Sequence, residues 1–164
     1  SNYFNYVTTI SSYAFGTIIP ALISATFNIV KTYDRTSIAP INYYTLSGYF
    51  NNDIGLLSLS STIYGYFRDI NANYNVIADI SGISLFGPSS IIQNYYINSQ
   101  ATISGNIYKK YLQVYGNDKN YDRSMLATVT ISNIVGNDYI QYFAQYDDYL
   151  VNANKNIYDL IKGT

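Results

Sequence analysis

The chain of 164 residues contains no cysteine and no histidine. Without cysteine, disulfides, a thiolate nucleophile and a sulfur-ligated zinc site are all excluded. Without histidine, the commonest general base and the imidazole ligands of metal centres are missing. Ser-His-Asp and Cys-His catalysis are therefore impossible. We predict a protein that is not an enzyme, with no catalytic residues and no cofactor other than the calcium ion considered below.

Glutamate is also missing, so all ten acidic residues are aspartates. Charged residues make up 12% of the chain, about half the usual share, and the net charge is −1. The nine lysines and arginines are scattered, which gives no basic patch for nucleic acid. The loss of this helix former, together with 21 tyrosines and many Ile, Thr and Val, favours β-structure.

Apolar and polar residues alternate along many short segments. In residues 19–29 the alternation places Ile19, Ile23, Phe27 and Ile29 on one face of a half-buried strand. Regular repetition of such segments predicts an all-β fold, an antiparallel β-sandwich of about 8–10 strands that is jelly-roll-like. The length suits a single sandwich domain over residues 1–164. Within it, residues 1–30 could form an N-terminal strand or arm that packs on a neighbouring subunit through the four apolar residues named above.

Turn-forming residues divide the rest of the chain into further expected strands. These strands lie at residues 41–50, 55–67, 74–86, 91–97, 101–105, 107–115, 125–135 and 139–146. We expect one hairpin over residues 41–67 and a second, better-marked hairpin over residues 125–146, around the turn at 136–138. Only residues 154–162 show a spacing with any helical character.

Two other patterns carry less weight. Residues 8–30 are uncharged, but a proline and clear alternation favour a strand over a membrane-spanning helix. A related tetrapeptide begins at Thr9, Thr45, Thr62 and Thr102, at unequal intervals that argue against a solenoid. Because the first residue is Ser rather than Met, we expect a processed or trimmed product.

A loop at residues 118–122 carries the most ligand-like residues. Asp118, Asn120 and Asp122 place oxygen atoms at alternating positions of a turn, as a calcium ion requires. The loop lacks the Gly and Glu of a complete EF-hand, so the choice lies between a looser calcium site and an ordinary Asn/Asp turn. The adjacent Asp147 and Asp148 are expected to be a solvated pair rather than two catalytic acids.

The tyrosines are the other feature that could carry a function. Tyr139, Tyr142, Tyr146 and Tyr149 form a cluster that suits stacking on a sugar or a protein surface. The alternative is that these rings mainly stabilise the sheets through cross-strand pairs.

The stretch Thr128-Val-Thr-Ile-Ser-Asn-Ile-Val-Gly-Asn-Asp-Tyr-Ile-Gln-Tyr resembles a late hairpin of TNF/C1q-like jelly-roll domains, such as those at viral or phage fibre tips. In that family a strand leads through a Gly-Asp turn into an aromatic-rich strand, whereas here Asn137 separates Gly from Asp. The similarity covers about residues 101–149. It implies a trimer whose loops contact a receptor or glycan.

Together these patterns predict a non-catalytic structural subunit of an extracellular or virion assembly, such as a capsid, fibre or filament. Low charge and abundant Tyr suit a surface that is covered by copies of the same chain. The alternative is a receptor- or carbohydrate-binding module with Tyr-rich loops, in which calcium takes part. We expect copies of itself as partners, a glycan or cell-surface receptor in the alternative, and neither nucleic acid nor a membrane span.

Overall fold

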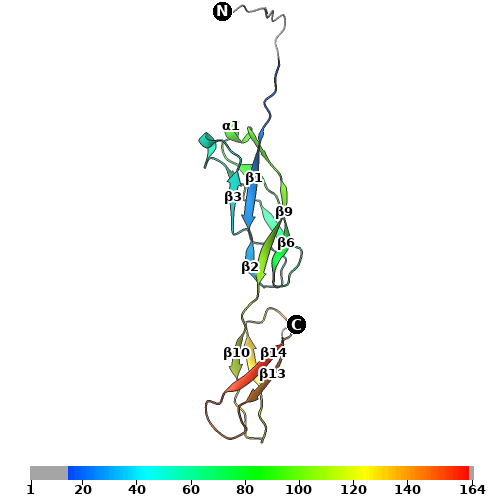
Figure 1. Ribbon diagram of the computed structural model, residues 1–164, viewed down its shortest axis with the longest axis vertical. Coiled ribbons are helices and arrows are strands. Elements are labelled where there is room, and N and C mark those ends of the chain that lie inside the picture. Colours follow the sequence, from blue (N-terminus) through cyan, green and yellow to red (C-terminus); the bar gives the residue numbers. More distant parts are fainter. Residues whose placement is uncertain (1–14, 163–164) are drawn as a thin grey trace, which may run out of the picture.

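The computed structural model is all-β, which confirms the predicted fold class. It describes residues 15–162, and side chains up to residue 158. Strand pairing divides the described chain into two groups, at residues 21–108 and 113–162, which we call the N-terminal unit and the C-terminal unit. The two units lie end to end and are joined by residues 109–112 (Figure 1). Within the described residues, no strand of one unit pairs with a strand of the other.

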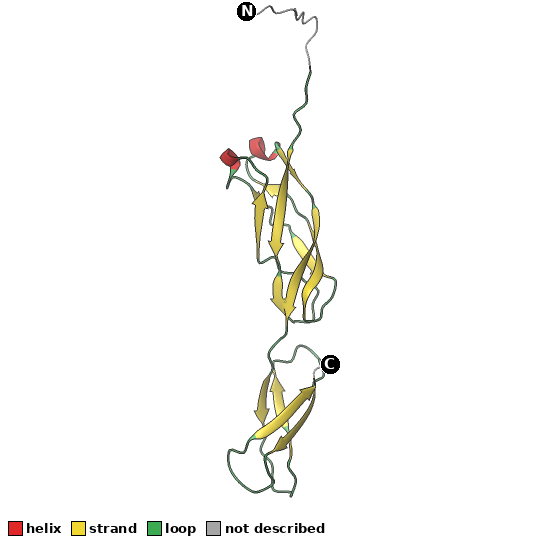
Figure 2. Ribbon diagram, in the orientation of Figure 1, coloured by secondary structure: helices red, strands yellow, loops and turns green. Residues whose placement is uncertain are grey.

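The N-terminal unit contains nine strands and two very short helices (Figure 2). The strands are β1 (Ala21–Asn28), β2 (Val30–Thr32), β3 (Tyr43–Ser47), β4 (Ser58–Leu59), β5 (Tyr64–Phe67), β6 (Asn73–Ser81), β7 (Leu85–Phe86), β8 (Tyr95–Ile97) and β9 (Gln100–Tyr108), and the helices are η1 (Asn51–Asp53) and α1 (Ser89–Ile92). Their sheets have the orders β3-β1-β8, β2-β9-β6-β5 and β4-β7. The pairs β1/β8 and β2/β9 are parallel, so the sheets are mixed rather than purely antiparallel.

The main core of this unit lies between the sheet of β1 and β3 and the sheet of β6 and β9. Alternate residues of β6, namely Val76, Ala78 and Ile80, point inward and are buried, as period-two alternation requires. Phe27 from β1 and Tyr44 from β3 pack against this core from the other sheet. The alternation that indicated strands in the sequence therefore also selects the residues of the core.

The C-terminal unit is smaller. Its strands are β10 (Gln113–Gly116), β11 (Leu126–Ala127), β12 (Val129–Ser132), β13 (Gln141–Tyr146) and β14 (Ile157–Lys162), in the sheet orders β10-β12 and β11-β13-β14. Its buried core consists of Ala127, Val129 and Ala144, with partly buried neighbours that include Ile131 and Ile157. The two units thus have separate cores. The prediction of one domain over residues 1–164 stays a prediction, because strand pairing does not determine whether the units unfold together.

Several predicted pairings are wrong. Residues 41–67 do not form a hairpin, because β3 pairs with β1, and the expected strand at residues 55–67 is divided into β4 and β5 by a turn. Residues 154–162, whose spacing has some helical character, contain the strand β14 (Ile157–Lys162), since β13 offers it a partner along its whole length. In the second predicted hairpin only β11 pairs with β13, whereas β12 pairs with β10.

Other predicted strands differ in their limits. The expected strand at residues 91–97 begins as α1, whose amides bond to the carbonyl of Pro88, before β8 starts. The expected strand at 107–115 is divided between β9 and β10. Within the described residues no helix is both long and apolar enough to cross a bilayer, and β1 occupies part of the uncharged segment.

Candidate functional site

A loop closed by a lysine follows β2 in the N-terminal unit. The Lys31 ammonium donates hydrogen bonds to Asp34 Oδ1 at 2.7 Å, to the Thr36 carbonyl at 2.6 Å and to Thr36 Oγ1 at 2.9 Å. Asp34 Oδ1 also accepts the Thr36 amide at 2.9 Å, while Arg35 adopts φ 63°. The Lys31 side chain is only 7% exposed. The largely buried Lys31 ammonium therefore joins the two ends of this loop.

The C-terminal unit contains the same loop. Lys119 donates to Asp122 Oδ1 at 2.9 Å and to the Ser124 carbonyl at 2.7 Å. Asp122 Oδ1 accepts the Ser124 amide at 2.9 Å, and Arg123 adopts φ 59°. We call residues 31–36 and 119–124 the first and second lysine loops. Their sequences, Lys-Thr-Tyr-Asp-Arg-Thr and Lys-Asn-Tyr-Asp-Arg-Ser, agree at four positions and conserve a hydroxyl residue at the last.

The strands that receive the two loops are equivalent as well. The Lys31 ammonium lies 5.9 Å from the centre of the Phe67 ring at the end of β5, and Lys119 lies 5.6 Å from that of Tyr146 at the end of β13. The amide of each aromatic residue donates to the backbone just after its loop, Phe67 to Ser37 at 2.7 Å and Tyr146 to Met125 at 2.8 Å. Thus β13 corresponds to β5.

The equivalence extends to the next strand, so that β14 corresponds to β6. Asn75 and Asn154 both have φ 56°, a left-handed conformation that asparagine tolerates better than most residues. The hydrogen bond from the Arg68 amide to Ile77 O has its counterpart between the Asp147 amide and Asn156 O. The two units are therefore an internal structural repeat. The related tetrapeptides that begin at Thr9, Thr45, Thr62 and Thr102 did not reveal this repeat, although the two lysine-loop hexapeptides are visible in the sequence.

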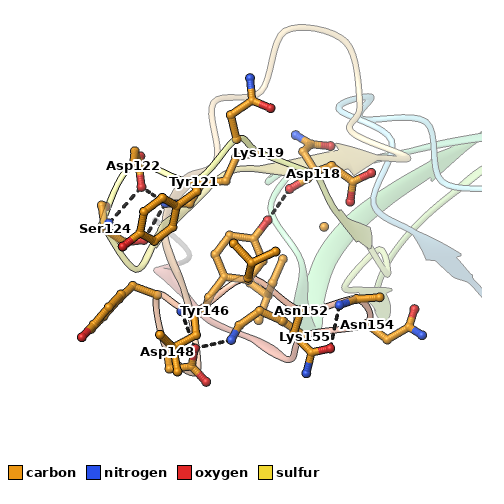
Figure 3. Close-up of a pocket in the computed structure, with 18 residues that line it drawn as sticks. Asp118, Lys119, Tyr121, Asp122, Ser124, Tyr146, Asp148, Asn152, Asn154 and Lys155 are labelled. Atoms are coloured by element: carbon orange, nitrogen blue, oxygen red, sulfur yellow. Dashed lines mark hydrogen bonds and ion pairs between the residues drawn. The ribbon is translucent and has the colours of Figure 1, made fainter.

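The predicted calcium residues line an open groove of about 770 Å³ beside the second lysine loop (Figure 3). Asp122 is already bound by Lys119, whose hydrogen bond lowers the pKa of Asp122 below its ordinary value. Asp118 lies apart from Asp122 in Figure 3. Within the described residues, no three acidic side chains come together in a way that could hold a metal ion. A calcium ion at Asp122 would compete with the partly exposed Lys119 ammonium, and the calcium site stays a prediction.

The aspartate pair next to this groove is also bound by a lysine. Lys155 contacts both Asp148 and Asp147, the latter at 3.3 Å. The hydrogen bond from Lys155 lowers the pKa of Asp148, and Asp148 in turn raises the pKa of Lys155. Asp148 Oδ1 also accepts the Leu150 amide at 2.6 Å. These contacts hold the loop at residues 147–155, and the lowered pKa of Asp148 is the opposite of what a general acid requires.

The predicted tyrosine surface is divided between two roles. Tyr139, Tyr142 and Tyr149 are exposed, at 80%, 38% and 52%. Tyr146 is partly buried, lies beneath Lys119 and donates from its hydroxyl to Asn117 O at 2.5 Å. Its role is structural, which leaves three rings of the cluster available for contact.

The four residues predicted for an assembly interface lie in different environments. Ile23 and Ile29 are each 1% exposed, in two separate buried clusters of the N-terminal unit, so neither is free to contact a neighbour, and Phe27 is partly buried against the cluster of Ile29. Ile23 lies in β1, which pairs with β3 and β8, and Ile29 directly follows β1 and lies against Gly105 of β9, neighbours that no local pattern specifies. Ile19 lies before β1 and is 79% exposed. Residues 1–14 of the predicted arm lie outside the described residues.

The junction between the units has side-chain contacts of its own. Arg35 of the first lysine loop lies 3.4 Å from Asp138, in the turn between β12 and β13. Desolvation and the nearby Asp138 carboxylate raise the pKa of Tyr33, another residue of this loop. The first lysine loop of the N-terminal unit therefore contacts the C-terminal unit.

No family model, curated protein or solved structure matches the chain. The resemblance of residues 128–142 to TNF/C1q-like domains therefore stays a prediction. The N-terminal and C-terminal units can still be compared with each other.

Proposed function

We propose that the chain is a structural module of an extended extracellular or virion assembly, a fibre or filament in which β units follow one another along an axis. The observation that carries this proposal is the repeat of one β unit, end to end, across the short link at residues 109–112 (Figure 1). Repeating units that contact only their neighbours build length rather than a single enclosed site.

The contacts at the junction support a stiff arrangement. Arg35 contacts Asp138 and also lies beside Gly136 of the same turn, so the link is not the only connection between the units. Two units with a fixed junction keep their outer ends at a more constant distance than two units joined by a flexible linker. The charged groups described above are engaged in holding loops, which agrees with a non-catalytic role.

The proposal is tested by electron microscopy and sedimentation velocity over a concentration series. We expect elongated particles that associate further as the concentration rises. An Arg35→Ala variant should bend more at the junction in small-angle scattering. The matched control is Arg123→Ala, the same position in the second lysine loop, which should leave the scattering curve unchanged. A compact particle that stays monomeric at every concentration would contradict the proposal.

A further inference from the structure

The C-terminal unit has an open sheet edge where the N-terminal unit has a strand. In the N-terminal unit β6 is paired on both sides, with β5 and with β9. In the C-terminal unit the equivalent strand β14 is paired with β13 alone, among the strands that the structure describes. The repeat therefore has a place for a strand equivalent to β9, and the described part of this unit does not fill it.

In the N-terminal unit β9 completes the core. It pairs with β6 over seven positions, which include Ala78 with Ile103 and Asp79 with Thr102. It also contributes Ile107, which is 2% exposed, and Gly105, which lies directly against Ile29. The side chains of β6 that face this core are among the most buried of the chain.

The C-terminal unit shows the effect of the open edge. Ile157 occupies the position of Ala78, which is fully buried in the N-terminal unit, yet Ile157 is only partly buried. The buried core is limited to Ala127, Val129 and Ala144, which belong to β11, β12 and β13. A strand along β14 would cover Ile157 and supply the missing backbone partners.

Residues 9–15 resemble β9 in sequence and share its Thr-Ile-Ser start. The sequence Thr9-Ile-Ser-Ser-Tyr-Ala-Phe follows that of β9 from its third residue, Thr-Ile-Ser-Gly-Asn-Ile-Tyr. Ser12, which carries a Cβ, stands at the position of Gly105, and both segments lie shortly before the first strand of a unit. The described residues that follow this segment run outward from the N-terminal unit (Figure 1), and Phe15 and Ile18 are 95% and 98% exposed.

From this repeat we infer that residues 9–15 of a second copy of the chain add as an antiparallel strand along the free edge of β14. The register of β6 with β9 places Thr9 opposite Tyr158 and Ile10 opposite Ile157. The described residues next to the donated segment, 15–20, lie at one end of the described molecule and the accepting unit at the other (Figure 1), so the contact we infer is head-to-tail and does not close on itself. This inference rests on the proposed function and names the contact that would propagate the fibre.

The test uses engineered disulfides in the full chain, which has no cysteine of its own. Thr9→Cys with Tyr158→Cys places two sulfurs on the same face of neighbouring strands. The matched control is Thr8→Cys with Tyr158→Cys, because a shift of one residue turns the side chain to the opposite face. We expect a ladder of dimers, trimers and longer species on a non-reducing gel for the first pair and monomer for the second.

Every other result counts against the inference. Equal ladders for both pairs would mean unspecific contact, no ladder for either would mean that the strand does not add, and a cross-link confined to the monomer would mean that the chain closes on itself. As a second measurement, Ile10→Asp should abolish the concentration-dependent sedimentation without changing the circular dichroism spectrum. If rods still assemble from this variant, the inference fails while the proposed function stands. If wild-type particles never associate, both fail.

Discussion

Gly105 offers the sharpest test of how β9 packs in the N-terminal unit. A Cβ added there would overlap Ile29 Cγ1 and the Ile29 carbonyl oxygen, and it would lie 2.8 Å from Ile29 Cδ1. Ile29 is 1% exposed and its backbone carbonyl accepts the Asn106 amide, so neither group can move aside without parting β2 from β9. Overpacking of a well-packed core costs about 1–3 kcal/mol, and because backbone is involved we expect about 3 kcal/mol for Gly105→Ala.

The free energy of unfolding should be measured in urea by circular dichroism, with a thermal melt beside it. For a unit of this size about 3 kcal/mol corresponds to a fall in Tm of roughly 12–24 °C. The control is Gly16→Ala, because a Cβ at Gly16 meets nothing within 4 Å. We expect that variant to lie within about 0.5 kcal/mol of wild type. If Gly105→Ala is as stable as the control, the close approach of β9 to Ile29 is refuted.

Three further predictions follow from the loops and cores. Lys31→Met should lower the free energy of unfolding by about 1–2 kcal/mol in urea, because it removes charged hydrogen bonds to Asp34, which solvent can only partly replace. Hydrogen bonds from Arg68 lower the pKa of Asp79 to about 2, so the stabilisation is complete above the unfolded value of about 4 and is lost as pH falls toward 2. Urea midpoints between pH 2 and 5 should show this fall, and Asp79→Asn should reduce its slope. Amide hydrogen exchange at low concentration should be faster in the C-terminal unit, whose buried core is smaller, and a uniform rate would contradict the picture of two cores.

The lysine loops show how far the site could be predicted. The sequence indicated oxygen ligands around residues 118–122, and the structure does gather oxygens there, but around the Lys119 ammonium. A ligand motif shows that oxygen-bearing residues are close together along the chain. It does not show which cation they contact, because that depends on where the Lys119 side chain lies in the folded protein. The repeat could have been found by comparing the two hexapeptides, but its extent could not, because β5 and β13 share little sequence beyond aromatic residues at equivalent positions.

The predicted hairpins failed for a related reason. A turn between two apolar runs favours a hairpin, yet β3 pairs with β1, about twenty residues earlier in the chain. Period-two alternation records which side of a strand is buried and says nothing about which edge it joins. The same limit applies to Ile23 and Ile29, which alternation placed on one face and which tertiary packing then enclosed within the chain.

The sequence by itself determined that this protein is built of strands, since strand propensity and alternation act within a few residues. It also determined which chemistry is excluded, because a side chain that is missing cannot be supplied by folding. Only the tertiary structure decided which strands are neighbours, that two units repeat, and that β14 is paired on one side alone among the strands that the structure describes. Those features depend on contacts between residues far apart in the chain, where closing the loops costs entropy and packing must offset that cost.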